Sequence, residues 1–422
     1  MEGKAMSFWE NVLLVFTSFR LELFTSMLSG ATCGLIGCFV ILRRMALIGD
    51  ALSHSILPGV VIAFMLAGTG PLAMFLGAML AGFLTTLCIS FLERHNRVKE
   101  DSAIGVAFAV FFAVGIILIS SLPRGTHFDL KCYLFGNPLA VQPSDLEMMM
   151  AVGVLVCASV ILFYRPLFLT SFDPIMATTV GIDVKRVHYL LMSLLAATVV
   201  ASLLTVGVIM VVAMIIAPGL VAYQLTDRLP VMLVLAFVVG AVSAGLGFVV
   251  SFALNWPPGP TMTVVAGILF LIALFFSPKY GVLFQWYRHH RARVHFLEED
   301  ILKYAARHYP EGMDLERLAE ILGVETRRLL RYVRRLVRRN MVSLRDGKVA
   351  LTGAGKVLAN EVLRAHRLWE SYLAHKGIDI HKVHDIAEAL EHAHQMADEL
   401  DDALGSPKED PHGKEIPPKT SC

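Results

Sequence analysis

Apolar segments long enough to form membrane-crossing helices fill most of the first 280 residues. About 20 consecutive apolar residues are needed to cross the hydrocarbon core of a bilayer as a helix. Over the whole chain, 56% of the residues are hydrophobic and only 17% are charged, which is typical of a polytopic membrane protein. The sequence therefore predicts an all-α membrane domain over residues 1–280. Its spans are expected at roughly 22–42, 45–66, 71–92, 101–122, 146–164, 189–206, 207–226, 231–254 and 261–277.

Basic residues predict the orientation of these spans, because cytoplasmic loops carry an excess of Lys and Arg. Nine spans with the N-terminus outside place every basic cluster in the cytoplasm, whereas eight spans place the basic C-terminal region outside the cell. We therefore expect nine spans in the plasma (inner) membrane, or eight plus a re-entrant helix, and a cytoplasmic C-terminal domain. At Gly207 the alternative is one long helix over 189–226 with a re-entrant end. The basic residues are Arg43 and Arg44, then Arg94, Arg97 and Lys99, then Arg165, Lys185 and Arg186, then Arg228, and finally Lys279 to Arg293.

Two ionisable residues, Asp50 and His54, lie inside the second apolar span. They are four residues apart, so both side chains lie on one face of a helix. Ionisable groups are costly in a bilayer and are therefore functional candidates by default. A carboxylate and an imidazole together can bind a divalent transition metal. The sequence predicts that this pair lines a metal path, and a structural hydrogen bond between helices is the alternative.

A second informative stretch lies in the predicted cytoplasmic loop 165–188. Asp173 and Pro174 form a helix-start signature, because Asp caps the first N–H groups and Pro fits the first turn. Ala177 and Gly181 follow, so a short helix with small residues on one side is expected between two spans. Such a helix either docks onto a partner or simply connects the spans.

The last third of the chain is polar, and eleven of the fifteen histidines lie after residue 287. A basic, aromatic linker over residues 281–295 suits anchoring at a lipid surface. Residues 296–351 are expected to form three helices and a hairpin, whose Asp346-Gly347 pair is a strong turn signal. Helix–turn–helix followed by a hairpin predicts a winged helix. The helices are expected at Leu297–His308, Asp314–Leu322 and about Glu325–Asn340, and the strands at Val342–Leu344 and Val349–Leu351.

The third of these helices is rich in arginine. Such a density on a recognition helix fits phosphate and groove contacts with DNA. A solvated face and a patch for anionic lipid are the alternatives. The predicted DNA-binding residues are Arg327, Arg328, Arg331, Arg334 and Arg335, with Arg338 and Arg339 after them.

Residues 352–404 are expected to form a helical metal-sensing and dimerisation domain, followed by a polar tail at 405–422. Two helices are expected there, and the second covers 381–404. On each of them, histidine and glutamate residues recur at spacings that place them on one face. Such a set, without a thiolate, suits Mn, Fe, Zn or Co. A solvated face of His and Glu is the alternative. The candidates are His366 and Glu370 on the first helix and His384, Glu388, Glu391 and His392 on the second.

Over about residues 10–280, in one register, the chain contains RRMALIGDALSHSILPG, YLFGNPLAV, DPIMATTVGIDVKRVHYLLM, GVIMVVAMIIAPG and PPGPTMTVVAG. Through these segments it resembles the permease subunits of ABC importers for zinc, manganese and iron. The resemblance implies a homodimer that takes metal from an extracytoplasmic binding protein. It places Asp50 and His54 on the family's intramembrane polar helix. It also implies that the helix around Asp173–Gly181 docks into a separate ATPase subunit.

The chain itself is expected to be a transport subunit and not an enzyme. Its segment Thr352–Lys356 imitates the end of a phosphate-binding loop. Ala350 stands where that loop needs Gly, and Val357 stands where it needs a Ser or Thr that binds Mg²⁺. ATP hydrolysis is therefore expected on a separate subunit.

The C-terminal third contains LTGAGKVLANEVLRAHRLWE, KVHDIAEALEHAH and SPKEDPHGKEIP. Through them, residues 296–417 resemble the iron- and manganese-dependent repressors, also called the diphtheria toxin repressor family. Glu388 matches the manganese-type members, whereas Lys303 stands where a second carboxylate is expected. The resemblance implies metal ligands at His366, Glu388, Glu391 and His392, a second site at His366, Glu370 and His384, and Asp300 as an N-terminal ligand.

The two parts together predict the permease subunit of an ABC importer for a divalent transition metal, manganese first and iron or zinc next. A cytoplasmic metal-responsive domain of the DNA-binding type is fused to it. In the simplest mechanism, cytoplasmic metal binds the sensor, which then restrains transport, regulates transcription, or does both. The alternative is a membrane-tethered or processed metal-dependent transcriptional regulator. Membrane lipid and, through the C-terminal domain, DNA are further expected partners, and no organic cofactor is expected.

Overall fold

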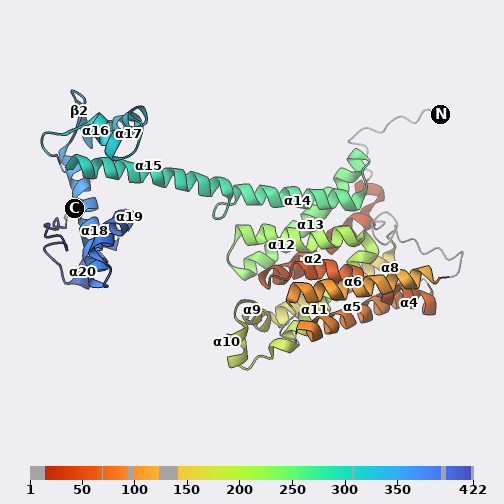
Figure 1. Ribbon diagram of the computed structural model, residues 1–422. Helices are drawn as coiled ribbons and strands as arrows, with labels where there is room; N and C mark the ends of the chain where they lie inside the picture. Colours follow the sequence, from red (N-terminus) through yellow and green to blue (C-terminus); the bar gives the residue numbers. More distant parts are fainter. Residues whose placement is uncertain are drawn as a thin grey trace, which may run out of the picture. The chain divides into compact units, whose positions relative to one another are not determined.

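The computed structural model describes residues 15–68, 70–93, 99–122, 141–306, 308–390 and 396–419. The chain divides into two compact units, Met1–Phe284 and Gln285–Cys422, and both are built mainly of helices (Figure 1). The predicted class, a helical membrane protein followed by a winged helix and a helical domain, is confirmed.

The first unit is a bundle of apolar helices. They are α2 (Arg20–Leu42), α3 (Leu47–Ser55), α4 (Leu57–Ala67), α5 (Pro71–Glu93), α6 (Glu100–Ser120), α8 (Pro143–Leu162), α9 (Tyr164–Phe172), α10 (Pro174–Thr179), α11 (Val184–Val206), α12 (Val208–Leu225), α13 (Leu229–Leu254) and α14 (Pro258–Phe276). Within the described residues, eight spans are long and apolar enough to cross a membrane: α2, α3 with α4, α5, α6, α8, α11, α13 and α14. The apolar helix Met210–Leu225 within α12 is shorter, so the described residues contain eight long spans and one short one.

Two apolar stretches are interrupted. Gly207 has a φ of +90° between α11 and α12, a conformation that glycine adopts without steric cost, so the split expected at this residue is found. Ile56 separates α3 from α4, and Pro58 follows in the first turn of α4. Proline has no N–H group and cannot continue the hydrogen-bond ladder back to His54. The second predicted span therefore consists of two short helices.

Helix α2 packs closely against α12 and α13, and every residue from Ser29 to Val40 is buried. A Cβ atom on Gly37 would lie 1.8 Å from the carbonyl oxygen of Ile215 on α12. A Cβ atom on Gly30 would lie 2.4 Å from the carbonyl oxygen of Gly240 on α13. Small residues allow such close approach, and in lipid this close packing contributes to helix association.

The second unit takes up most of helix α15 (Val282–Ala306). The sequence suggested a separate linker over 281–295 and a first helix from Leu297, but one helix covers both. The stretch 282–306 contains no Gly or Pro, so nothing in it breaks a helix. Helix α16 (Leu315–Ile321) and α17 (Thr326–Arg338) follow. Their buried residues Leu318, Leu329 and Val333 form one core with Ile301 and Leu302 of α15.

A small antiparallel sheet completes the winged helix. It contains β1 (Met313–Asp314), β2 (Val342–Arg345) and β3 (Lys348–Leu351) in the order β1-β3-β2. Arg345 pairs with Lys348, so Asp346 and Gly347 form a two-residue loop with φ values of +49° and +78°. Positive φ at both positions is what a type I′ hairpin turn requires, and the predicted hairpin is confirmed. Strand β1 was not predicted, because two residues are too few to show an alternating pattern.

Further along this unit, the described residues form α18 (Gly353–His375), α19 (Ile380–Leu390) and α20 (Ala397–Leu404). The last two lie where a single helix was expected at 381–404, although α19 begins one residue earlier, and residues 391–395 lie outside the described part of the chain. Arg364 of α18 forms ion pairs with Asp398 and Asp401 of α20. Hydrogen bonds from Lys419 and Arg364 lower the pKa of Asp398.

Replacement of Gly37 by alanine is expected to lower the free energy of unfolding by about 1–3 kcal/mol or more, because the new methyl group overlaps the backbone of Ile215. The measurement is the unfolding temperature of the purified chain in detergent. Gly105→Ala on α6 is the matched control, since nothing lies within 4 Å of a Cβ atom there and alanine is the better helix former. Equal destabilisation at the two positions would contradict the close contact between α2 and α12.

Candidate functional site

Helix α3 carries both Asp50 and His54. The Nε2 atom of His54 lies 3.5 Å from Oδ1 of Asp50. The His54 side chain is 20% exposed, whereas that of Asp50 is 51% exposed. The imidazole is therefore largely enclosed, while the carboxylate is accessible.

Aromatic rings enclose His54 on one side. Phe108 and Phe112 of α6 lie against its ring, with centroid distances of 5.4 and 5.2 Å. The Nδ1 atom of His54 is buried and has no hydrogen-bond partner among the described residues. Buried polar atoms are normally paired. When Nε2 carries the proton toward Asp50, the lone pair of Nδ1 is available to bind a metal ion.

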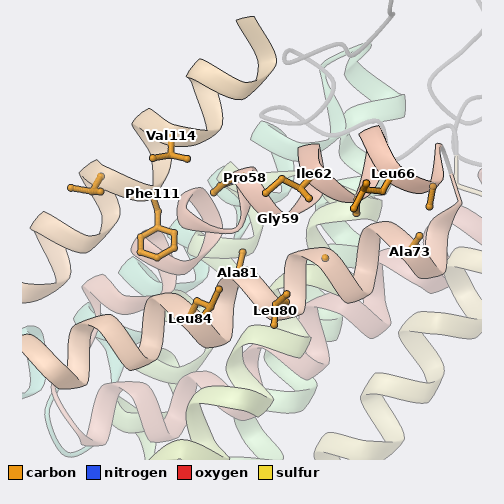
Figure 2. Close-up of a pocket in the computed structure, with 14 residues that line it drawn as sticks. Pro58, Gly59, Ile62, Leu66, Ala73, Leu80, Ala81, Leu84, Phe111 and Val114 are labelled. Atoms are coloured by element: carbon orange, nitrogen blue, oxygen red, sulfur yellow. The ribbon is translucent and has the colours of Figure 1, made fainter. Parts of the chain in front are cut away.

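A hollow of about 510 Å³ lies between α4, α5 and α6. Figure 2 shows Ile62 and Leu66 of α4, Leu80 of α5 and Phe111 of α6 around it, and all of its lining residues are apolar. Carbon atoms provide no ligand for a hard cation. This hollow therefore does not bind the metal, and its chemistry suits a lipid chain or another apolar helix.

The stretch predicted to dock onto a partner forms α9 and α10. The carboxylate of Asp173 accepts a hydrogen bond from the Met176 amide, at 2.9 Å, and caps α10. Gly181 has a φ of +88° just beyond the C-terminal end. The Gly181 and Ile182 amides donate to the carbonyls of Thr178 and Ala177, which is a Schellman motif. Pro174 is the first residue of α10, as the sequence suggested.

Ala177 is fully buried, so it holds α10 in place and does not form an outer surface. The exposed side chains of this segment are larger and apolar. Ile175 is 78% exposed, Val180 62% and Met176 53%. Exposed apolar groups gathered at a short helix make this segment a candidate interaction site. Sequence reasoning looked for small residues here and missed these three.

Arg43 connects this segment to the helix that carries Asp50. It is the C-cap residue of α2, four residues before α3 begins. Its guanidinium donates hydrogen bonds to Thr170 Oγ1, at 2.7 Å, and Ser171 Oγ, at 3.3 Å, on α9. A pocket of about 570 Å³ at this joint is lined by Arg43, Arg44, Lys185 and His188 among others. Burial lowers the pKa of Arg43, although a guanidinium stays protonated at neutral pH.

The arginines of α17 do not all have the same surroundings. Arg335 and Arg339 form ion pairs with the buried carboxylate of Glu298 on α15, at 3.3 and 3.0 Å. They hold α17 against α15. The other arginines of the predicted DNA-binding face are exposed on the opposite side from the buried Leu329 and Val333; they are Arg327, Arg328, Arg331, Arg334 and Arg338.

The predicted metal-sensing residues are distributed over three segments. His366 and Glu370 are both buried on α18, with Nε2 3.2 Å from Oε1. His412, from the C-terminal segment, lies 4.0 Å from the same oxygen of Glu370. Sequence reasoning did not single out His412, because a lone histidine in a proline-rich tail gives no periodic signal.

Glu388 of α19 contacts a cationic side chain. Its Oε1 atom lies 3.4 Å from Nζ of Lys303 and 3.4 Å from the Tyr304 hydroxyl, both on α15. Asp300, the predicted N-terminal ligand, lies one turn before Tyr304 and is half-buried. His384 lies on α19, but its side chain, together with Glu391 and His392, is outside the part of the chain that the structure describes.

A metal ion needs several ligands at one place. The described residues contain no group of three or more His, Cys, Asp or Glu side chains placed to hold a metal ion. They contain the pair His366–Glu370 with His412 nearby, and Glu388 paired with an ammonium group that cannot coordinate a cation. Because His384, Glu391 and His392 lie outside the described side chains, the two-site arrangement that the resemblance implied stays a prediction.

Residues 17–277 match the ABC 3 transport family. Residues 352–418 match the iron dependent repressor, metal binding and dimerisation domain. These matches confirm both resemblances that the sequence motifs suggested.

The relatives agree with the permease match. The chain is 49% identical over 288 residues to the manganese transport system membrane protein MntC of Halalkalibacterium halodurans, covering 68% of this chain and 97% of that protein. It is 35% identical over 252 residues to the chelated iron transport system membrane protein YfeD of Yersinia pestis, covering 60% and 83%. The solved structure of PsaBC from Streptococcus pneumoniae in complex with Fab has a TM-score of 0.59 and 36% identity, covering 64% and 97%. The chain therefore belongs to the ABC 3 transport family.

Proposed function

We propose that this chain is the membrane permease subunit of an ABC importer for a divalent transition metal, with manganese as the first candidate and iron or zinc as the next. Membership of the ABC 3 transport family supports the proposal, as does the 49% identity to a protein named for manganese transport. Within the chain, the observation that carries it is the Asp50–His54 pair on α3.

The pair offers a passing metal ion one carboxylate and one imidazole. Both are suitable ligands for first-row divalent metals, and carboxylate oxygen favours manganese. In this proposal the accessible carboxylate of Asp50 and the enclosed Nδ1 atom of His54 each provide one ligand. Transport requires binding that is strong enough for entry and weak enough for release. A site with two ligands from one short helix releases a metal ion more readily than a closed site with four protein ligands.

A separate ATPase subunit supplies the energy in this proposal, and it docks on α10. The exposed Ile175, Met176 and Val180 provide an apolar contact, and the basic pocket beside them suits an acidic group of the partner. Movement of α9 and α10 would be transmitted to Arg43 through its hydrogen bonds with α9, and from Arg43 along the chain to α3. Two copies of the chain form the channel, and an extracytoplasmic binding protein delivers the metal, in keeping with the family resemblance.

The second unit is proposed to lie in the cytoplasm, because its N-terminal helix and winged helix are basic. Its match to a metal-binding repressor domain supports a regulatory role, with His366 and Glu370 as the first candidates for sensing metal. A second candidate function is DNA binding by a membrane-tethered or processed regulator. The exposed arginines of α17 favour it.

Asp50→Asn or His54→Ala is expected to reduce metal uptake by at least about tenfold, since each removes a ligand while leaving a similar or smaller side chain. Uptake of manganese into cells or proteoliposomes is the measurement, with the amount of assembled transporter as the reference. Asp101→Asn, which alters an exposed carboxylate at the start of α6, is the matched control and should transport normally. Normal uptake by both site variants would reduce the pair to a structural hydrogen bond.

Ile175→Asp is expected to prevent a co-expressed ATPase from co-purifying with the chain and to stop uptake, because it places a charge in an apolar contact. Leu254→Asp is the control: it makes the same kind of change at an exposed apolar residue, 46% exposed, at the far end of α13. Retention of the ATPase and of uptake by Ile175→Asp would argue against docking on α10.

Two arginines of α17 should respond differently to alanine. Arg331→Ala is expected to weaken binding of the intact chain to DNA, measured by gel shift at several salt concentrations, with little change in stability. Arg335→Ala is expected to lower the free energy of unfolding by about 1–3 kcal/mol, because the buried Glu298 loses one partner. If the parent chain does not bind DNA, the second candidate function is wrong. The stability prediction for Arg335 does not depend on that result.

A further inference from the structure

The side chain of Lys303 is buried to an unusual degree for a lysine. It is 1% exposed, and it is among the largest fully buried side chains of the molecule. Its neighbours along α15, Ile301, Leu302 and Ala305, are fully buried in the core of the winged helix. Lysine is almost never enclosed in this way unless it is paired.

The pairing joins two elements that are far apart in the sequence. The ammonium of Lys303 on α15 lies 3.4 Å from Oε1 of Glu388 on α19. The hydroxyl of Tyr304 lies 3.4 Å from the same oxygen. The carboxylate of Glu388 therefore connects the helical domain to the winged helix, through an ion pair with Lys303 and a hydrogen bond from Tyr304.

We propose that the Lys303 ammonium takes the place of a metal ion at Glu388. It is a fixed internal cation that holds α15 to α19 whether or not metal is present. The ammonium neutralises the carboxylate that a metal ion would need, and its positive charge repels a divalent ion from the same place. The two helices are therefore clamped together permanently. Any response of this unit to metal must come through other side chains, and the described His366–Glu370 pair is the first candidate.

The proposal concerns the second unit alone and does not depend on transport through Asp50 and His54. The test uses the full chain carrying Asp50→Asn and His54→Ala, so that metal bound by the permease unit does not contribute. Binding of Mn²⁺ to the purified protein is followed by electron paramagnetic resonance, and unfolding of the second unit is followed by limited proteolysis during heating.

Lys303→Met keeps the length of the side chain, suits the apolar surroundings, and leaves Glu388, which is 45% exposed, able to be hydrated. It is expected to bind Mn²⁺ at least about tenfold more tightly than its parent, because the repelling charge is gone. Lys303→Glu is expected to gain about one bound Mn²⁺ per chain, together with a protection from proteolysis that requires Mn²⁺ and that the parent lacks.

The charge exchange Lys303→Glu with Glu388→Lys is the matched control. It restores an ion pair between α15 and α19 and should return Mn²⁺ binding and metal-independent protection to the parent level. Unchanged or weaker Mn²⁺ binding by Lys303→Met would overturn the proposal. The proposal would also be overturned if the parent chain bound Mn²⁺ and the Glu388→Gln variant did not. Glu388 would then be a metal ligand despite the presence of Lys303.

Discussion

The close contact of α2 with α12 and α13 is the constraint on which the arrangement of the permease unit depends. Gly30 and Gly37 let the backbones approach so closely that no side chain fits between them. This fixes the C-terminal end of α2, where Arg43 hydrogen-bonds to α9. Helix α3 begins four residues later and carries Asp50 and His54. The candidate metal path and the candidate docking segment are therefore positioned by the same helix end.

Much of the fold could be predicted because its signals are local. Long apolar runs identified the spans, Gly207 marked the split between α11 and α12, and Asp346-Gly347 identified the hairpin. The break at Ile56 was missed, because apolar length alone predicts one span there, whereas Pro58 in the first turn of α4 is the signal that marks a new helix. The continuity of α15 was missed for the opposite reason. A change in composition near residue 296 suggested a boundary, although nothing in 282–306 breaks a helix.

The candidate sites were less predictable, because they depend on partners distant in the sequence. The i, i+4 spacing was enough to find Asp50 with His54 and His366 with Glu370. Spacing could not show that Arg335 faces Glu298, or that Glu388 faces a lysine 85 residues away. The resemblance to repressors drew attention to Lys303 as an exception to a pattern. Only the folded structure, in which Lys303 meets Glu388, shows what that lysine contacts.

The break at Ile56 also has an electrostatic consequence. A helix carries a partial negative charge at its C-terminal end, where its last carbonyl groups point outward. His54 lies in the last turn of α3, so the end of this short helix adds its field to the charge of Asp50. Broken helices in membranes commonly present such ends to cations. An uninterrupted span with the same two side chains would place that field at the far end of the helix, away from Asp50 and His54.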